Sequence, residues 1–489
     1  MEKKWILITE SYDGLSKTAI NCLTATIATY LPYVLPVKLI NEISENIYRE
    51  YNIILVGRSS NARMIELCNE KECILPTMSE EYSIFVGKNI YNEQFEMIAI
   101  VGNDEKGILY GCMDFCNRYC GKELLFVEDH NQMFNENFFS ELFENSLREW
   151  KVHEKPSIPT RAIWTWGHVI YDYKNFLMNM SKLRLNEIVI WNDYIPFNAK
   201  EIVNFAHFLG IKVIWGFAWG WGLNCADEMQ KFTSEGLNIL KENVLSVFET
   251  QYASTAGDGI YFQSFTELNT DNVGEKCIAE VVTNFVNDVA GELLNRYPSL
   301  HIQFGLHATS VKNQLQYLKK LDKRVCIVWE DCGAFPYAYR GEQTENFEET
   351  KSLVCELMKL RGEEEKFGSV LKGMVNLDWK HFKYATGSTI IGESSAEFIK
   401  RRQTEKNRLW KIVQANWLKN AEYARVIISE IEKNSQNPII QGLVEDGMFE
   451  NEIMFPVALF ADLLWNPNRK IEDVIEAVAK YPCVKFANI

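Results

Sequence analysis

Basic residues are in deficit in this sequence, and long apolar runs are missing. Lys and Arg number 51 against 66 Asp and Glu, so the formal net charge is −15. An acidic chain does not supply the positive field needed to bind a phosphate backbone, so we expect no nucleic-acid partner. No segment approaches the roughly 18 apolar residues of a spanning helix, and the apolar run 5–8 is too short for a signal-peptide core. We therefore expect a cytoplasmic protein without a membrane partner, either monomeric or homo-oligomeric.

Motifs for metals and nucleotides are missing as well. The 12 cysteines are scattered, and Cys112, Cys116 and Cys120 recur at helical spacing without the paired CxxC of a zinc site. The 7 histidines show no HxH or HExxH spacing, and no GxGxxG or GxxxxGK[ST] occurs in a usable context. We therefore expect no metal, no cofactor, and free cysteines packed in a reduced interior.

Residues 1–150 alternate strand-like and helix-like segments, which predicts a small α/β domain. The strand-like segments are 4–9, 51–56, 82–86 and 96–101, and the helical patterns are 16–31, 61–70 and 106–120. Either Asn103 or Asp104 is suited to cap the last of these helices. Pro156 and Pro159 then break any helix and mark a junction.

From Arg161 onward, apolar runs alternate with helical patterns, which favours parallel strands. Eight such runs fit the usual size of a closed (β/α)8 TIM-type barrel, and we predict this barrel for residues 151–394. No strand is expected after residue 395, and we therefore predict an α-helical C-terminal region for residues 395–489. The eight predicted strands are 162–166, 187–191, 212–217, 259–265, 301–305, 325–329, 370–377 and 388–391.

Catalytic groups of such barrels lie at the carboxyl ends of the strands, where this sequence repeatedly places tryptophan beside polar residues. Sugars stack their C–H faces on indole rings and hydrogen-bond to carboxylates and amides, so the pattern predicts a carbohydrate substrate. A single tryptophan at a strand end more often belongs to a core, but the recurrence favours a binding site. The predicted substrate-binding residues are Trp166, His168, Trp191, Asn192, Asp193, Trp219, Trp221, Gln263, Trp329, Asp378, Trp379 and Lys380.

Cleavage of a glycosidic bond needs two carboxyl groups, one to protonate the leaving oxygen and one to act as base or nucleophile. Glu267 closes the fourth strand and is predicted to be the acid, although a Glu after a strand is usually a solvated loop residue. Glu330 or Asp331 after the sixth strand is predicted to supply the base, and Asp193 and Asp378 are the alternatives. Because strands four and six are not adjacent, their carboxylates should face each other across a water, which favours inversion.

Four short motifs resemble those of glycosidases in which an α/β domain precedes a catalytic barrel. They are similar to motifs of the family 20 β-hexosaminidases, the family 84 hexosaminidases, and the family 67 and 115 α-glucuronidases. The motifs are GNDEKGILYG at 102–111, which resembles GxDxxGxxYG; Pro156, Pro159 and Arg161 at the first barrel strand; KLRLN at 182–186; and WNP at 465–467.

The resemblance is closer to the α-glucuronidases in one respect. Family 20 enzymes place Asp-Glu and family 84 enzymes Asp-Asp after strand four, whereas this sequence offers Glu267 alone. The resemblance therefore implies that the acid of the α-glucuronidases maps onto Glu267 and their base region onto Glu330 and Asp331. We predict an exo-acting glycosidase for a short oligosaccharide or glycoside, with a β-N-acetylhexosaminidase-like enzyme and an inactive sugar-binding barrel as the alternatives.

Overall fold

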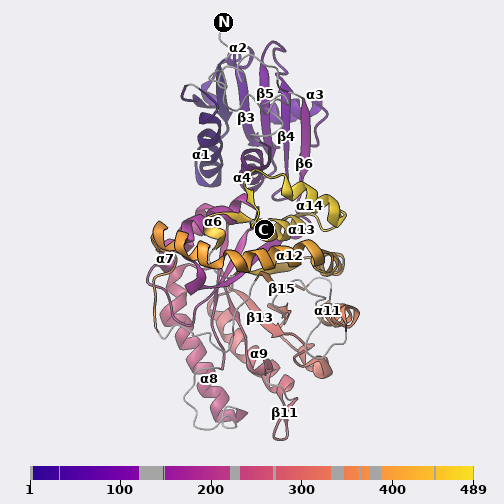
Figure 1. The fold of residues 1–489 in the computed structure, drawn as a ribbon. Helices are drawn as coiled ribbons and strands as arrows, with labels where there is room; N and C mark the ends of the chain where they lie inside the picture. The colour runs from indigo at the N-terminus through magenta and orange to yellow at the C-terminus, as the bar shows by residue number, and fades with distance from the viewer. Residues whose placement is uncertain are drawn as a thin grey trace. The chain divides into compact units, whose positions relative to one another are not determined.

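A computed structural model of the chain describes residues 4–31, 33–119, 147, 149–220, 232–267, 271–331, 346–362, 365–374, 387–444 and 448–487 (Figure 1). The chain divides into two compact units. The first comprises Met1–Pro156, Phe208–Gly210 and Lys480–Cys483, and the second comprises Ser157–His207, Ile211–Ala479 and Val484–Ile489. Within the described part of the chain, no helix is both long and apolar enough to cross a membrane.

The first unit is built on a six-stranded sheet with the order β2-β1-β3-β5-β4-β6. Strands β4 and β6 run antiparallel to their neighbours, whereas β1, β2, β3 and β5 are parallel. Strand β6 pairs with β4, so the predicted boundary at residue 150 falls at the start of a strand that belongs to this sheet. The elements are β1 (Trp5–Thr9), α1 (Gly14–Ala28), β2 (Val37–Leu39), α2 (Ile47–Glu50), β3 (Asn52–Arg58), α3 (Ala62–Glu70), β4 (Tyr82–Lys88), β5 (Glu96–Gly102), α4 (Glu105–Asp114) and β6 (Trp150–Glu154).

The GxDxxGxxYG-like segment forms the turn from β5 into α4. Asp104 is the cap of α4, because its Oδ1 accepts a hydrogen bond of 2.8 Å from the backbone N–H of Gly107. A Cβ at Gly107 would lie 2.4 Å from the carbonyl oxygen of Glu81, so only glycine permits this close approach. The motif therefore has a packing role in the first unit.

The second unit contains a closed barrel of eight parallel strands with helices around it, which confirms the predicted (β/α)8 fold. Its strands are β7 (Thr160–Trp166), β8 (Glu187–Trp191), β9 (Lys212–Gly216), β10 (Gly259–Phe262), β13 (His301–His307), β14 (Val325–Glu330), β15 (Phe367–Met374) and β16 (Ile439–Val444). The helices between them are α6 (Tyr173–Lys182), α7 (Ala199–Phe208), α8 (Ser234–Val247), α9 (Ile278–Arg296), α10 (Leu315–Leu318), α11 (Phe347–Arg361) and α12 (Ala396–Asn434).

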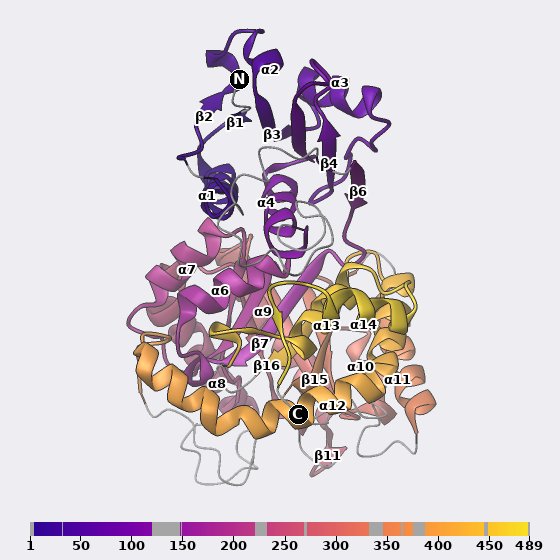
Figure 2. The ribbon, with the colours of Figure 1, turned by 45° about the horizontal axis from the view of Figure 1, so that its top comes forward.

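The eighth strand is not where the sequence pattern placed it. Residues 388–391 form no strand, and Ile390 is 63% exposed. The barrel is closed instead by β16, which follows the 39 residues of α12 and pairs with β7. The prediction of a purely helical region after residue 395 is therefore wrong. That region contains α12, β16, α13 (Phe455–Trp465) and α14 (Ile471–Ala479), together with the short strands β17 (Ile453–Met454) and β18 (Val484–Lys485). Helices α12 and α13 pack side by side (Figure 2).

Three of the motifs converge where β7 and β8 begin. The Arg161 Nε donates to the Arg184 carbonyl over 2.8 Å, and the guanidinium groups of both arginines stack on the Trp465 ring at 5.0 and 4.1 Å. The buried Arg184 also pairs with Asp462 over 3.1 Å. These motifs therefore attach α13 to the start of the barrel and are distant from the carboxyl ends of the strands.

Candidate active site at the barrel mouth

Four aromatic side chains occupy the interior of the barrel near the carboxyl ends of its strands. Trp164 and Trp166 of β7, Trp191 of β8 and Tyr261 of β10 belong to one buried cluster, here called the aromatic cluster. The centroid of the Trp164 ring lies 4.6 Å from that of Trp166, and 5.9 Å from those of Trp191 and Tyr261. We call this end of the barrel the mouth.

Glu330 is the last residue of β14 and points into the mouth. The residue is 1% exposed, and both oxygens of its carboxylate have polar partners. Oε1 accepts from the Tyr261 hydroxyl at 2.5 Å and from the Gln263 amide at 2.7 Å. Oε2 accepts from the same amide at 2.9 Å and pairs with the Lys372 ammonium at 3.0 Å. Residues of β10, β14 and β15 thus meet at one carboxylate.

This environment keeps Glu330 ionised. Burial raises the pKa of the Glu330 carboxyl, but the charges of Lys372 and His307 and the hydrogen bonds from Tyr261 and Gln263 outweigh burial and bring the pKa below its ordinary value. An ionised carboxylate held by fixed donors can stabilise positive charge on a bound molecule or accept a proton from it.

Gly305 of β13 makes room for this carboxylate. A Cβ at this position would lie 2.3 Å from the Glu330 Oε1 and 2.5 Å from the Tyr261 Oη. Any side chain at residue 305 would therefore displace the two groups that the site holds together.

Two further carboxyl groups at the mouth have different environments. Asp193 follows β8, which lies four places from β14 in the closed strand order, on the opposite side of the mouth. Burial raises the pKa of Asp193, although hydrogen bonds from the Ala218 N–H and Trp191 oppose the rise. The buried Asp331 accepts a hydrogen bond of 2.9 Å from the Lys372 backbone N–H. Of the two carboxylates predicted here, Glu330 faces the interior of the barrel. Asp331 instead accepts a hydrogen bond from the main chain of β15.

The structure corrects the prediction for two tryptophans. Trp329 is adjacent to Glu330 on β14, and neighbouring residues of a strand face opposite sides, so its ring points out of the barrel and donates to the Ala308 carbonyl at 2.9 Å. Trp219 is fully buried and stacks on Phe262 at 3.6 Å with an interplanar angle of 9°. The Phe285 ring of α9 meets it edge-on at 6.4 Å. Neither ring is a wall of the mouth.

The remaining predicted residues either follow a barrel strand or fall outside the described part of the chain. His168 is exposed in a short 3₁₀ helix after β7, and the amide of Asn192 donates to the Tyr194 carbonyl. Glu267 ends the 3₁₀ helix Phe265–Glu267, which follows β10. Outside the described residues lie Trp221, Asp378, Trp379 and Lys380.

The predicted site residues did not include Trp164, Tyr261 or Lys372. Tyr261 and Gln263 are two residues apart, and the spacing alone places them on one face of the chain. Lys372 lies within the apolar strand predicted at 370–377. A lysine in such a strand indicates a buried ion pair, because lysine is rarely buried unless paired. Among the described residues, no group of three His, Cys, Asp or Glu side chains is placed to hold a metal ion.

Comparison with known proteins adds information on the fold. Neither the protein-family models nor the curated proteins compared with the sequence match it. The chain is similar to the solved structure of CpGH84B, with a TM-score of 0.55 and 11% identity, over 98% of this chain and 70% of that one. A second solved structure, CpGH84D, gives a TM-score of 0.45 and 12% identity over 75% of this chain and 56% of that one. At these identities, the likeness to CpGH84B is one of fold.

Proposed function

We propose that this chain is an exo-acting glycoside hydrolase for a short oligosaccharide or glycoside, with an inverting mechanism like that of the α-glucuronidases. The observation that carries the proposal is Glu330, an ionised and buried carboxylate at the mouth of a (β/α)8 barrel. Trp166 and Trp191 lie in the same interior layer and supply the apolar surface that a sugar ring needs. The name of CpGH84B, which shares the fold, refers to a glycoside hydrolase family.

Glu330 is suited to the role of base, and Glu267 is the proposed acid. A base must be unprotonated at working pH, as the lowered pKa of Glu330 ensures. The Gln263 amide bridges both oxygens of Glu330, and an incoming water can replace it at one of them. A general acid needs a raised pKa. Burial raises the pKa of Asp193, which is among the described carboxyl groups of the mouth. Asp193 is therefore the second candidate for the acid.

An activity screen on aryl glycosides tests the proposal. Wild type should hydrolyse one of a set that includes aryl α-glucuronides, and Glu330→Gln should lower kcat by at least about a hundredfold, since it removes the base. Glu397→Gln, at an exposed position of α12, makes the same chemical change away from the barrel and should leave kcat unchanged. Hydrolysis by Glu330→Gln at the wild-type rate would overturn the assignment.

The same screen separates the two candidates for the acid. Removal of the acid slows substrates with poor leaving groups far more than activated aryl glycosides, because the latter need little protonation. Glu267→Gln should show this selective loss, and Asp193→Asn should not. If the pattern is reversed, Asp193 is the acid.

The fold shared with CpGH84B favours a second candidate function, a β-N-acetylhexosaminidase-like hydrolase. That chemistry requires two carboxylates together after the fourth strand, where this chain has Gln263, Ser264, Phe265 and Thr266 before Glu267. Preferential hydrolysis of aryl N-acetylglucosaminides would support it over the first proposal. Saturable sugar binding without hydrolysis of any glycoside in the set would instead indicate a sugar-binding barrel.

A further inference from the structure

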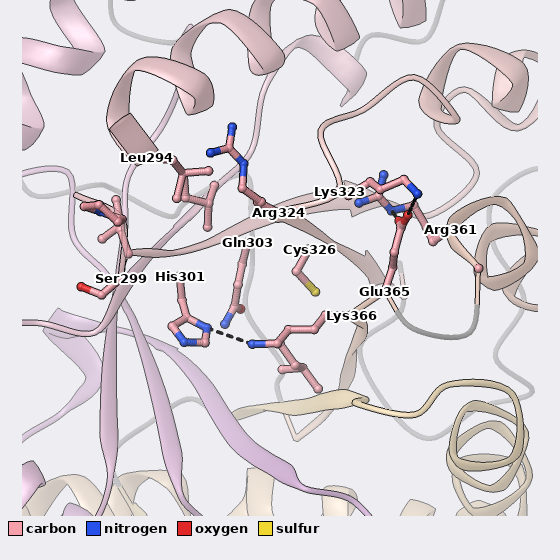
Figure 3. A pocket seen from close by; sticks show the side chains of 15 residues that line it. Leu294, Ser299, His301, Gln303, Lys323, Arg324, Cys326, Arg361, Glu365 and Lys366 are labelled. Atoms are coloured by element: carbon pink, nitrogen blue, oxygen red, sulfur yellow. Dashed lines mark hydrogen bonds and ion pairs between the residues drawn. The ribbon is translucent and has the colours of Figure 1, made fainter. Parts of the chain in front are cut away.

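A cavity of about 930 Å³ opens at the end of the barrel opposite the mouth, where β13, β14, β15 and β16 begin (Figure 3). We call it the basal cavity. Its size falls within the range of pockets that hold small organic ligands. Its wall includes the first residues of the strands and the loops that lead into them, among them His301, Gln303, Cys326 and Ile439.

Cationic side chains predominate in the wall of the basal cavity. Lys323, Arg324, Arg361 and Lys366 line it, against the single carboxylate of Glu365. This local excess contrasts with the net charge of −15 carried by the whole chain. An anionic ligand would therefore find a favourable potential here and an unfavourable one over much of the remaining surface.

Internal partners account for only part of this positive charge. Arg361 pairs with Glu365 at 2.9 Å and donates to the Leu321 carbonyl at 3.0 Å. Arg324 pairs with Asp322 at 2.6 Å, and the Lys323 ammonium lies 3.6 Å from the carboxylate of Glu365. Among the described residues, Lys366 forms no ion pair with a carboxylate. Its ammonium lies 3.4 Å from the Nδ1 of His301, toward which Figure 3 shows it pointing.

The contact between Lys366 and His301 fixes the state of the imidazole. An ammonium can only donate, so Nδ1 of His301 accepts and the ring proton resides on Nε2. Burial, together with the charges of Lys366 and Lys212, lowers the pKa of His301 to about 4 against the opposing charge of Asp258, and the ring is neutral at pH 7. His301 therefore offers a second donor beside a cation.

The floor of the basal cavity is polar but internally satisfied. Gln303, 1% exposed, donates to the carboxylate of Glu187 at 2.9 Å and accepts from the Gln441 amide at 2.6 Å. Glu187 is the carboxylate that faces this region from β8, and burial raises its pKa, opposed by the hydrogen bond from Gln303 and by the charge of Lys212.

We propose that the basal cavity binds the phosphate group of a small metabolite, with Lys366 and His301 as the central contacts and Lys323 and Arg324 at the rim. A phosphate carries charge and acceptor oxygens in several directions, which matches cations contributed by separate segments of the chain. The site lies at the opposite end of the barrel from Glu330, so it does not depend on the proposed hydrolytic function.

Calorimetric titration of the full chain at pH 7.5 tests the proposal, with ionic strength held constant by chloride. Inorganic phosphate and glucose 1-phosphate are the probes, and citrate is the carboxylate comparison. Both phosphates should bind saturably, and Lys366→Gln should weaken them by about tenfold, the usual effect of losing one charge-assisted contact. Lys419→Gln, at an exposed position of α12, removes the same charge elsewhere and should leave both affinities unchanged.

Two controls keep the outcome decisive. Lys366→Arg retains the positive charge and should retain binding, which separates loss of the contact from loss of the fold. Absence of saturable binding by both phosphates would overturn the proposal, as would equal affinity of wild type and Lys366→Gln. Binding of citrate in preference to phosphate would overturn the assigned ligand class.

Discussion

The Lys372 ammonium lies 3.0 Å from Oε2 of Glu330, and both side chains are largely buried between neighbouring strands β15 and β14. A carboxylate buried to this extent would ordinarily become protonated. The adjacent cation, with the donors Tyr261 and Gln263, reverses that tendency. The pKa of Glu330 is thus set by side chains from several segments of the barrel, including His307 of β13.

Removal of this cation should shift the pH dependence of the proposed activity. Lys372→Met takes away a charge that lowers the pKa of Glu330, so the pKa rises and the base becomes protonated at higher pH. We expect the acidic limb of the kcat/KM profile to move upward by about one to three pH units. Lys372→Arg retains the charge and should leave the limb close to its wild-type position. An unmoved limb in Lys372→Met would show that Glu330 does not control the reaction.

A methyl group at Gly305 should disturb the mouth directly. The Cβ of Gly305→Ala would overlap the Glu330 Oε1 and the Tyr261 Oη, and displacement of a reacting group by about 1 Å can cost up to about a hundredfold in rate. We expect kcat/KM to fall by about tenfold or more. Gly291→Ala on α9 meets nothing within 4 Å and should leave kinetics unchanged. Equal activity of the two variants would contradict the close approach.

The buried pair of Arg184 and Asp462 should matter for stability rather than activity. Asp462→Asn removes the negative charge that pairs with the buried guanidinium of Arg184 and with Arg469, and we expect the free energy of unfolding to fall by about 3 kcal/mol. The matched control is Glu249→Gln, which breaks an exposed pair with Arg296 and should not measurably change stability. Denaturant unfolding of both variants checks the prediction, and a similar response in the two would contradict it.

The stability of the chain should acquire a pH dependence from His301. Its pKa is about 4 in the folded protein against an ordinary 6.5, so the unfolded chain binds a proton between these values and the folded chain does not. The contribution of His301 to stability is therefore complete above about pH 6.5 and is lost as the pH falls toward 4. His301→Gln should unfold with a shallower pH dependence in this window, measured as Tm against pH. Superimposable curves for wild type and variant would disprove the shift.

Most of the barrel could be predicted because buried parallel strands are continuous apolar runs. The run 187–191 coincides with β8, and the run 162–166 lies within β7. Strand β16 was missed because its evidence is not local. Gln441 interrupts its apolar pattern, and Gln303, to which its amide donates, is 138 positions away in the chain.

The sequence predicted only in part which residues at the strand ends could form a site. Spacing predicts that Trp329 and Glu330 face opposite sides of β14, but not which of them faces the interior. That choice depends on the closure of the barrel, which brings Tyr261 and Lys372 to Glu330. The position of Trp219 depends likewise on Phe262 and on helix α9.

The amino-acid sequence by itself determined the alternation of strands and helices and the placing of Glu330 at the end of an apolar strand, because local propensity and short-range burial act along the chain. Only the tertiary structure decided the identity of the eighth strand, the inward direction of Glu330 and the lowered pKa of its carboxyl. These depend on groups from distant segments, and their electrostatic effect arises only when folding removes them from water.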